Sequence, residues 1–334
     1  MKYQNNFFKD KSVLVTGASG TIGSHIIKFL IKKNCRVIRA FSNDENGLYD
    51  LDNQINHHVH NDLLRNMKIK NIRYLLGDVR DYKRCKKSSE DIDIIIHAAA
   101  LKHVPICEYN SEESYKTNFL GTKNIIKAAI ANEVKLFLFI STDKVINPTS
   151  WMGKTKLMAE NFVIKKNSSK VKTKFAAIRF GNVIGSRGSV LLRFFEQIKL
   201  GKTITVTHPD MTRFFITIDS AVRSIFKSLL LMNGGEIFII KNMKAFKILD
   251  LANSLKKLMN AKNKIIYSGI RKGEKVYEEL MSKKEEQHVS TKKNFYILTK
   301  KKTKFNDKVQ IKNSQTTRHL KKKELGVFLK KILI

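Results

Sequence analysis

The feature that most constrains the fold is a short apolar run that leads into a glycine-rich turn and then a helical pattern. Residues 12–16 form a β-rich apolar run, Gly17-Ala18-Ser19-Gly20-Thr21-Ile22-Gly23 follows at once, and residues 24–33 place apolar side chains at helical spacing. Glycines let a backbone approach a pyrophosphate closely, and a helix amino terminus presents unpaired N–H groups to it. This order predicts a dinucleotide-binding fold, with cofactor-binding candidates Gly17, Ser19, Gly20, Thr21, Ile22 and Gly23.

Strand and helix patterns alternate through the first half of the chain. Apolar runs predict strands at 35–41, 72–76, 92–96, 136–140 and 174–179, and periodicity predicts helices at 115–131 and 151–161. The polar stretch 48–71 contains His57-His58-Val59-His60 without further ligands at metal-binding spacing, so we expect a surface loop and a short helix and no metal. We therefore predict an α/β protein with a Rossmann-type doubly wound parallel sheet.

The regular alternation weakens after a second glycine-rich loop at 181–189. This change predicts a smaller C-terminal lobe that binds the substrate. We expect residues 1–180 to form mainly the NADP-binding domain and residues 181–290 mainly the substrate-binding lobe, in segments interleaved with the first domain. Residues 291–334 are expected to be a basic C-terminal extension that ends in an amphipathic helix over 325–334.

The end of the second predicted strand favours NADP over NAD. Arg39 and Ser42 lie nearer that end than Asp44. Arginine or serine at this place suits a 2′-phosphate, whereas an acidic residue suits the 2′-hydroxyl of NAD.

The turns after the next two strands also face the expected crevice. Asp78, followed by Val79, is a candidate for capping the next helix or for reaching the adenine amino group. The small residues Ala98, Ala99 and Ala100 let the backbone run against the cofactor, and Lys102 is a candidate for a phosphate or sugar contact.

The candidate reaction centre follows the fifth predicted strand. Ligands of open α/β sheets bind at the carboxyl ends of the strands, and this end carries Thr142, Asp143 and Lys144. A closed site can move the pKa values of such an acid and base toward neutrality, whereas the alternative is an ordinary solvated ion pair. Met152 and Lys156 lie four residues apart, so a helix here places both side chains on one face.

Charge and cysteine content bear on partners and compartment. The net charge of +35 suggests nucleic-acid binding, but the lysines are spread along the chain and no nucleic-acid-binding motif gives them a docking geometry. A positive field would still attract an anionic sugar nucleotide. Cys35, Cys85 and Cys107 are expected to be reduced structural thiols. No signal-peptide core or bilayer-spanning apolar run is present, so we expect a cytoplasmic protein without membrane insertion.

Together these segments resemble the extended short-chain dehydrogenase/reductase superfamily. More narrowly, they are similar to the UDP-N-acetylglucosamine 4,6-dehydratases of surface polysaccharide and capsule biosynthesis, in a variant with methionine in the active site. The resemblance rests on residues 16–23, 98–105, 141–144, 152–156, 179–183, 211–215 and 273–275.

The resemblance implies a redox-neutral cycle on one tightly held NADP. Hydride leaves C4 of the sugar, Lys144 removes the C5 proton as general base, and Asp143 protonates the departing C6 hydroxyl. Hydride then returns to C6 and leaves a UDP-4-keto-6-deoxy sugar. Lys156 would bind the nicotinamide ribose. Met152 stands where a tyrosine usually serves the C4 hydroxyl, and its thioether cannot take that proton, so Thr142, a water or Lys144 are the candidates.

The resemblance also bears on stereochemistry, substrate contacts and assembly. Relatives without a membrane-anchored amino-terminal half tend to invert C5, so inversion is favoured, and this family commonly forms homo-oligomers. Asn43 stands where an arginine for the 2′-phosphate is expected. Arginine offers a planar fork that suits diphosphate oxygens. The substrate-binding candidates are Lys102, Asn118, Asn182, Arg213, Arg271 and Glu274.

Two other readings compete with the dehydratase. A 4-epimerase or 4-keto reductase of the same superfamily would need an acid or base at the C4 hydroxyl and would leave the Asp-Lys pair without a purpose. A non-catalytic Rossmann protein that binds nucleic acid through its charge would bind with steep salt dependence and without a dinucleotide.

Overall fold

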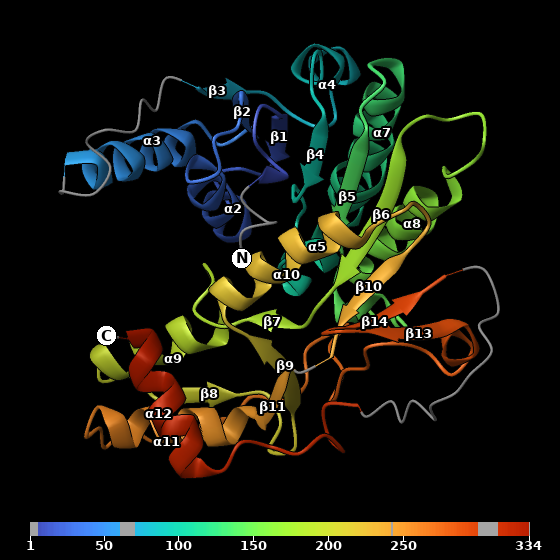
Figure 1. The fold of residues 1–334 in the computed structure, drawn as a ribbon. Coiled ribbons are helices and arrows are strands. Elements are labelled where there is room, and N and C mark those ends of the chain that lie inside the picture. The colour runs from blue at the N-terminus through green and yellow to red at the C-terminus, as the bar shows by residue number, and fades with distance from the viewer. Residues whose placement is uncertain (1–5, 61–70, 242, 300–312, 334) are drawn as a thin grey trace.

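The computed structural model describes residues 6–60, 71–241, 243–299 and 313–333, and the chain folds around a nine-stranded sheet with helices on both faces (Figure 1). The strand order is β13-β14-β10-β6-β5-β4-β1-β2-β3. The seven strands from β10 to β3 are parallel, and the β13–β14 hairpin extends the sheet in antiparallel fashion. The predicted Rossmann-type doubly wound sheet is therefore confirmed. Its strands are β1 Ser12–Thr16, β2 Val37–Ser42, β3 Ile72–Leu76, β4 Ile94–His97, β5 Leu136–Ile140, β6 Lys174–Arg179, β10 Ile237–Ile240, β13 Val289–Lys292 and β14 Phe295–Leu298.

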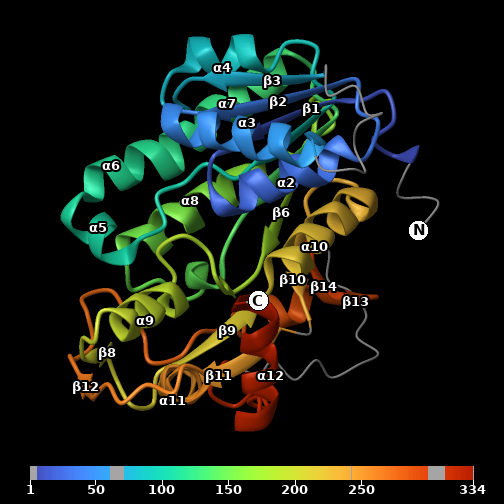
Figure 2. The same cartoon turned by 90° about the vertical axis from the view of Figure 1, so that its left-hand side faces the viewer.

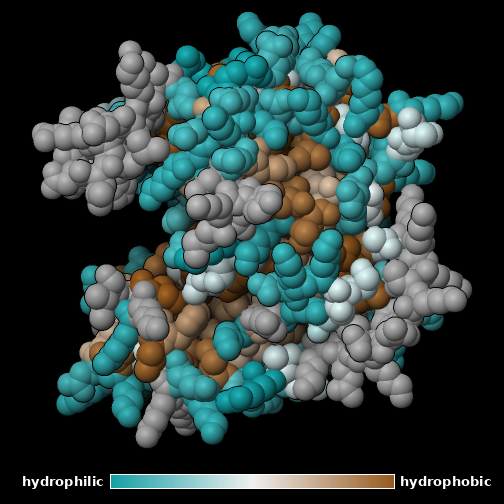
Figure 3. Space-filling view, in the orientation of Figure 1, coloured by the Kyte–Doolittle hydropathy of each residue, from teal (hydrophilic) through white to brown (hydrophobic). Residues whose placement is uncertain are grey.

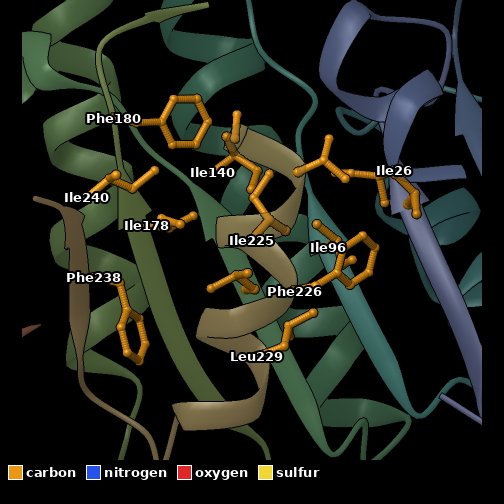
Figure 4. Packing of buried hydrophobic residues seen from close by; sticks show 14 of the residues in the cluster. Ile26, Ile96, Ile140, Ile178, Phe180, Ile225, Phe226, Leu229, Phe238 and Ile240 are labelled. Atoms are coloured by element: carbon orange, nitrogen blue, oxygen red, sulfur yellow. The ribbon is translucent and has the colours of Figure 1, made fainter. Parts of the chain in front are cut away.

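Two helical layers cover this sheet (Figure 2). On one face α2 (Thr21–Ile31), α3 (Glu45–His60) and α10 (Ile218–Leu231) bury their apolar sides in one core cluster. Figure 4 shows Ile225 and Phe226 of α10 among the buried side chains of the strands. The other face holds a second cluster with α4, α7 and α8. These and the remaining helices on this side are α4 Tyr82–Ser88, α5 Val104–Tyr109, α6 Ser111–Tyr115, the π-helix Lys116–Leu120, α7 Gly121–Ala131, the 3-10 turn Asp143–Val145 and α8 Trp151–Lys165.

The predicted strands agree closely with the observed ones. The bounds of β1, β3, β5 and β6 are those expected, whereas β2 and β4 begin two residues later than predicted, at Val37 and Ile94. At the start of β4, the Asp93 carboxylate accepts the Ser12 N–H at 2.9 Å, and the Asp93 carbonyl accepts that of Lys135. Because these groups of Asp93 are bonded to the start of β1 and to the residue before β5, the regular hydrogen bonding of β4 with its neighbouring strands starts after Asp93.

Two helical predictions need correction. The stretch 48–71 was expected to be a surface loop and a short helix, yet the helix α3 is long and runs from Glu45 to His60. Its Leu48, Leu51 and Ile55 recur at helical spacing and are buried. Residues 61–70 lie outside the described part. The single helix expected at 115–131 is α6 and α7 joined by the π-helix.

The remaining elements build a smaller lobe below the sheet. Its core cluster joins residues of α9, β8, β9, α11 and α12 and is separate from the two clusters of the large sheet. Figure 3 shows apolar residues on this face between the sheet above and the lobe below. The lobe elements are β7 Asn182–Val183, α9 Val190–Lys199, β8 Ile204–Val206, β9 Thr212–Ile216, β11 Lys244–Lys247, α11 Ile248–Leu258, β12 Ile265–Tyr267 and α12 Lys322–Leu333. The 3-10 turn Glu285–His288 leads into β13, and its Glu285 pairs with Arg179 of β6 in the large sheet.

The chain crosses between the two parts more than once. α10 and β10 follow the first lobe elements in sequence but pack in and on the large sheet. The amphipathic closing helix is confirmed as α12, and its Leu325 and Leu329 are fully buried in the lobe.

Predictions from the sequence also concern the three cysteines and membrane-spanning segments. Cys35, Cys85 and Cys107 are buried free thiols, as predicted, and burial raises the pKa of Cys35 and of Cys85 to about 12. Within the described ranges, no helix is both long and apolar enough to cross a bilayer.

Candidate functional site

The carboxyl ends of β1, β4, β5 and β6 open into a cleft of about 560 Å³, a volume typical of small-molecule sites. The sheet side of the cleft carries the glycine loop, the segment after β4 and the segment after β5. The other wall comes from the lobe and includes Val183, Arg213 and Phe215. The fold therefore brings together the two glycine-rich loops and the predicted reaction centre.

The glycine loop after β1 leaves space that a side chain would fill. Gly17 has φ +66°, and a Cβ built on it would lie 2.7 Å from the backbone nitrogen of Ala99. Gly20 caps α2 without a side chain, so no side-chain bond competes for the helix amino terminus. A Cβ on Gly23 would overlap the Gly17 carbonyl. Gly17, Gly20, Thr21, Ile22 and Gly23 all line the cleft, and this arrangement fits a dinucleotide pyrophosphate.

Beside this loop the ends of two strands carry hydroxyl groups. The hydroxyls of Ser19 and Ser42 lie 2.8 Å apart. Asp44 accepts the N–H of Gly47 at 2.9 Å and faces the guanidinium of Arg187 at 3.8 Å. The Arg187 N–H also donates to the Thr21 hydroxyl at 3.1 Å, so the second glycine-rich loop crosses over the first.

Arg39 does not reach the cleft, and its assignment to a 2′-phosphate is corrected. Its guanidinium donates to the carbonyls of Ser88 and Glu90 at 2.8 and 2.5 Å. Arg39 pairs in register with Leu14 in the middle of the sheet, and its side chain extends toward the amino-terminal ends of the strands, where Asp91 and Asp93 border a separate depression.

Three more cofactor candidates lie next to the cleft without lining it. Asp78 accepts the backbone and side chain of Arg80, and Asp81, not Asp78, caps α4. Val79 is buried in the core, and Ala99 presents its backbone to Gly17. Ala98 and Ala100 do line the cleft.

The predicted acid and base form a close pair at the start of the segment after β5. The Lys144 ammonium donates to Asp143 Oδ1 at 2.9 Å and to Asn182 Oδ1 at 2.8 Å. Asp143 is fully buried, whereas the Lys144 side chain is 20% exposed and lines the cleft. Thr142 donates its hydroxyl to Asp143 at 3.0 Å and also lines the cleft. The pair is therefore not an ordinary solvated ion pair.

The two lysines of the site are in opposite electrostatic states. Burial lowers the pKa of Lys144, but the carboxylates of Asp143 and Glu278 more than offset it, so this pKa lies above its usual value. Burial lowers the pKa of Lys156 to about 7, and Glu160 opposes this only in part. Lys156 donates to the Ile140 carbonyl at 2.6 Å. A fixed charge thus sits at Lys144, while Lys156 titrates near neutral pH.

Met152 and Lys156 lie on the same face of α8, as predicted, and both line the cleft. Met152 is 4% exposed and brings no proton-transferring group to this place. Ser150 caps the helix by accepting the N–H of Gly153 at 3.1 Å. The cap sets the start of α8 and with it the direction of both side chains.

The six substrate candidates occupy different places. Lys102, Asn182, Arg213 and Glu274 line the cleft, while Arg271 lies outside it beside Glu274 at 3.9 Å. Asn118 is corrected: it is buried, and its amide group exchanges bonds with the backbone of Leu101 at 2.8 and 3.1 Å. It positions the segment after β4 rather than facing a ligand.

The sequence analysis missed Glu278 and Lys275, which also line the cleft. Glu278 is 3% exposed and faces Lys144 at 3.7 Å, Arg213 at 3.8 Å and Lys275 at 3.7 Å. A single glutamate after a charged segment has no sequence pattern that would mark it as a site residue, so only the fold reveals this cluster of charges.

The doubly wound sheet carries a glycine loop, and Lys144 after β5 lines the same cleft with its buried partner Asp143 beside it. Together with the relatives described below, these features define an enzyme of the short-chain dehydrogenase/reductase type, in the nucleotide-sugar dehydratase and epimerase superfamily. More narrowly, residues 13–300 match the model of one family, described as "Polysaccharide biosynthesis protein". The chain belongs to this family.

Two similar proteins match nearly the whole chain. An X-ray structure of Pen from Bacillus thuringiensis is 37% identical with a TM-score of 0.89, and the match covers 97% of this chain and 98% of that one. A Methanocaldococcus jannaschii protein named "Uncharacterized membrane protein MJ1061" is 41% identical over 98% of both chains.

Other relatives carry names with activities. A Campylobacter jejuni "UDP-N-acetylglucosamine 4,6-dehydratase (inverting)" is 38% identical over 87% of this chain and 84% of its own length. A Rickettsia bellii "UDP-glucose 4-epimerase" is also 38% identical, over 86% and 83%. The match to the capsular polysaccharide biosynthesis protein CapD of Staphylococcus aureus is 42% identical over 83% of this chain but spans only 46% of CapD. These similarities support both a dehydratase and an epimerase name.

Proposed function

We propose that this protein is an NADP-dependent UDP-N-acetylglucosamine 4,6-dehydratase that inverts C5 and serves surface polysaccharide biosynthesis. The observation that carries the proposal is the pair of Asp143 and Lys144, hydrogen-bonded at 2.9 Å, in which Lys144 lines the same cleft as the glycine loop and Asp143 is buried beside it. An elimination needs one group that removes a proton and another that protonates a leaving hydroxyl, and these two side chains supply both.

The pair begins as an ion pair and must be converted before it can act. With the pKa of Lys144 raised, Lys144 is an ammonium group at neutral pH. Movement of one proton across the bond from Lys144 to Asp143 gives an amine and a carboxylic acid. The amine then takes the C5 proton, and the acid protonates the C6 hydroxyl, which departs as water.

The remaining steps close the proton balance. The glycine loop would hold NADP, which would supply the hydride acceptor for C4 and the hydride donor for C6. Inversion requires that C5 receive its new proton on the face opposite to the one that Lys144 deprotonated, so a solvent proton adds there and Lys144 releases its own proton to solvent. The proton lost from the C4 hydroxyl replaces the one that left in water. In place of the usual tyrosine there is Met152, so Thr142, a water or Lys144 must receive the C4 proton. Thr142 donates to Asp143 at 3.0 Å and can relay a proton toward that carboxylate.

The cofactor preference rests on the residues near the end of β2. One oxygen of Asp44 accepts the Gly47 N–H and the other faces Arg187. Because both oxygens already have protein partners, this carboxylate is not well placed to accept the 2′-hydroxyl of NAD. The Ser19 and Ser42 hydroxyls and the Arg187 guanidinium lie around the same place, and such donors suit a 2′-phosphate. Arg187 supplies the cation that Asn43 cannot.

The substrate would bind between the two parts of the molecule. We propose residues 1–180 as mainly the cofactor domain, 181–290 as mainly the substrate lobe and 291–334 as a C-terminal extension. Lys102, Asn182, Arg213 and Glu274 would contact the UDP-sugar from the cleft, with Arg271 at its rim. A cytoplasmic location and a homo-oligomeric state stay predictions.

The test is proton NMR of the purified protein with UDP-N-acetylglucosamine in deuterated water, without added cofactor. A new C6 methyl signal with deuterium at C5 is expected, and the ring couplings distinguish inversion from retention. A change at C4 alone would establish the 4-epimerase instead, the reading that the Rickettsia bellii name favours. Unchanged substrate together with salt-sensitive binding of nucleic acid would favour a non-catalytic protein.

A further inference from the structure

Glu278 is a buried carboxylate at the point where the lobe meets the reaction centre. It is 3% exposed and lines the cleft, and its segment is held to the lobe by the Ser314 hydroxyl, which accepts the Glu278 N–H at 2.9 Å. Burying a carboxylate is costly unless charges and hydrogen bonds compensate for it. The surroundings of Glu278 therefore indicate what it does.

Three cations lie around this carboxylate, and two of them donate hydrogen bonds to backbone carbonyls instead. Arg213 donates to the carbonyls of Thr212 and Lys275 at 2.7 and 2.8 Å, and Lys275 donates to the Ile146 carbonyl at 2.6 Å. Their distances of 3.8 and 3.7 Å to Glu278 are those of ion pairs without a hydrogen bond. These two cations balance the charge of Glu278 but leave its oxygens available.

Lys144 is the third cation and connects Glu278 to the chemistry. Its ammonium lies 3.7 Å from Glu278 Oε1 and is also held by Asp143 and Asn182. These groups come from three separate parts of the chain. Glu278 thus adds an ion pair to Lys144 from a segment bonded to the lobe, beside the hydrogen bond to Asp143.

The second oxygen of Glu278 has no hydrogen-bond donor among the described residues. A buried acceptor without a donor is costly, and this cost is relieved when a ligand supplies the donor. Hydroxyl groups are the donors that a sugar offers. The diphosphate of a nucleotide sugar, in contrast, offers only acceptors and cannot donate a hydrogen bond to this oxygen.

We propose that Glu278 belongs to the reaction centre: one carboxylate oxygen positions the ammonium of Lys144, and the other accepts a hydrogen bond from a hydroxyl of the bound sugar. This inference rests on the proposed function for the identity of the sugar. It adds a contact that distinguishes a nucleotide sugar from the bare nucleotide, because UDP lacks the hexose, and its only sugar hydroxyls are those of the ribose.

The test compares Glu278→Gln and Glu278→Asp with Glu279→Gln at the adjacent position. The Glu279 carboxylate accepts a hydrogen bond from the exposed Asn147 amide at 3.1 Å. Circular dichroism and retained dinucleotide check the fold of each variant. For Glu278→Gln we expect the KM for UDP-N-acetylglucosamine to rise about tenfold or more, while the inhibition constant of UDP stays within about twofold.

The pH profile separates positioning from a purely structural role. The charged groups that face Lys144 are Asp143, Glu278 and Arg213, with Lys275 behind Glu278. Removing the negative charge of Glu278 lowers the pKa of Lys144, so the limb of the kcat/KM profile on which Lys144 loses its proton should move to lower pH. Glu278→Asp should restore that limb in part, and Glu279→Gln should match the wild type.

Two results would overturn the inference. One is a Glu278→Gln enzyme whose KM and pH limb match the wild type, and the other is a loss of activity in which UDP and UDP-sugar weaken equally. An inactive wild type would defeat the proposed function instead. In that case calorimetry with UDP-N-acetylglucosamine and with UDP would test the role of Glu278. Glu278→Gln should weaken the binding of the UDP-sugar and leave that of UDP unchanged.

Discussion

A buried ion pair behind the reaction centre gives the sharpest prediction about stability. Glu160 and Arg179 are 0% and 1% exposed, and they are joined by bonds of 2.8 and 2.5 Å. Glu160 also accepts the hydroxyl of Ser141 at 2.6 Å, next to Thr142. The pair therefore links β6 and α8 to the end of β5, and its loss should also shift residues that line the cleft.

The magnitude follows from what each substitution leaves behind. Breaking a buried pair by removing one partner typically costs about 3–5 kcal/mol, since the other charge stays buried. In Glu160→Gln, Arg179 keeps a bond of 2.7 Å to Glu285, whose side chain is 26% exposed. We therefore expect a loss near the lower limit, about 3 kcal/mol. Replacing both partners, in Glu160→Met with Arg179→Met, should cost less than the sum of the two single changes.

The assay is urea denaturation of the cofactor-bound protein, with unfolding monitored by circular dichroism. The matched control is Glu133→Gln, which removes a surface pair with Lys172 whose side chains are 64% and 75% exposed. It should change the free energy of unfolding by about 0.5 kcal/mol or less. The reasoning is refuted if Glu160→Gln costs no more than this control, or if the two methionine substitutions are simply additive.

The remaining predictions concern the cleft. Lys144→Ala should abolish dehydration and keep the dinucleotide bound; an active variant in the NMR assay would remove the base assignment. Met152→Tyr should fold and keep its dinucleotide, checked by absorbance of the purified protein, because residue 152 lines the cleft and a larger side chain can extend into it. Gly17→Ala should weaken dinucleotide affinity about tenfold or more, measured by fluorescence titration, since its Cβ would lie 2.7 Å from Ala99 at φ +66°. The pKa of Lys156 is lowered from 10.5 to about 7, so the unfolded chain binds more protons and stability should rise from about pH 7 upward; Lys156→Met should flatten this rise in denaturation experiments.

The sequence alone determined the features that depend on local order. β1, the glycine loop and α2 follow one another without a gap, and the bounds of β5 and β6 follow from short apolar runs. Asp143 and Lys144 could be selected because they come directly after β5, where parallel sheets place their ligands. Met152 and Lys156 share a face of α8 because helical spacing requires it.

Only the tertiary structure decided which distant side chains meet at the cleft. Arg39 stands near the end of a strand in sequence, but its guanidinium reaches the opposite edge of the sheet. Asn118 holds the backbone of Leu101. Glu278 reaches Lys144 across the cleft from the lobe. Such contacts depend on how the loops and the lobe close over the sheet, and the packing of the whole chain fixes that geometry, whereas strand and helix patterns depend on near neighbours.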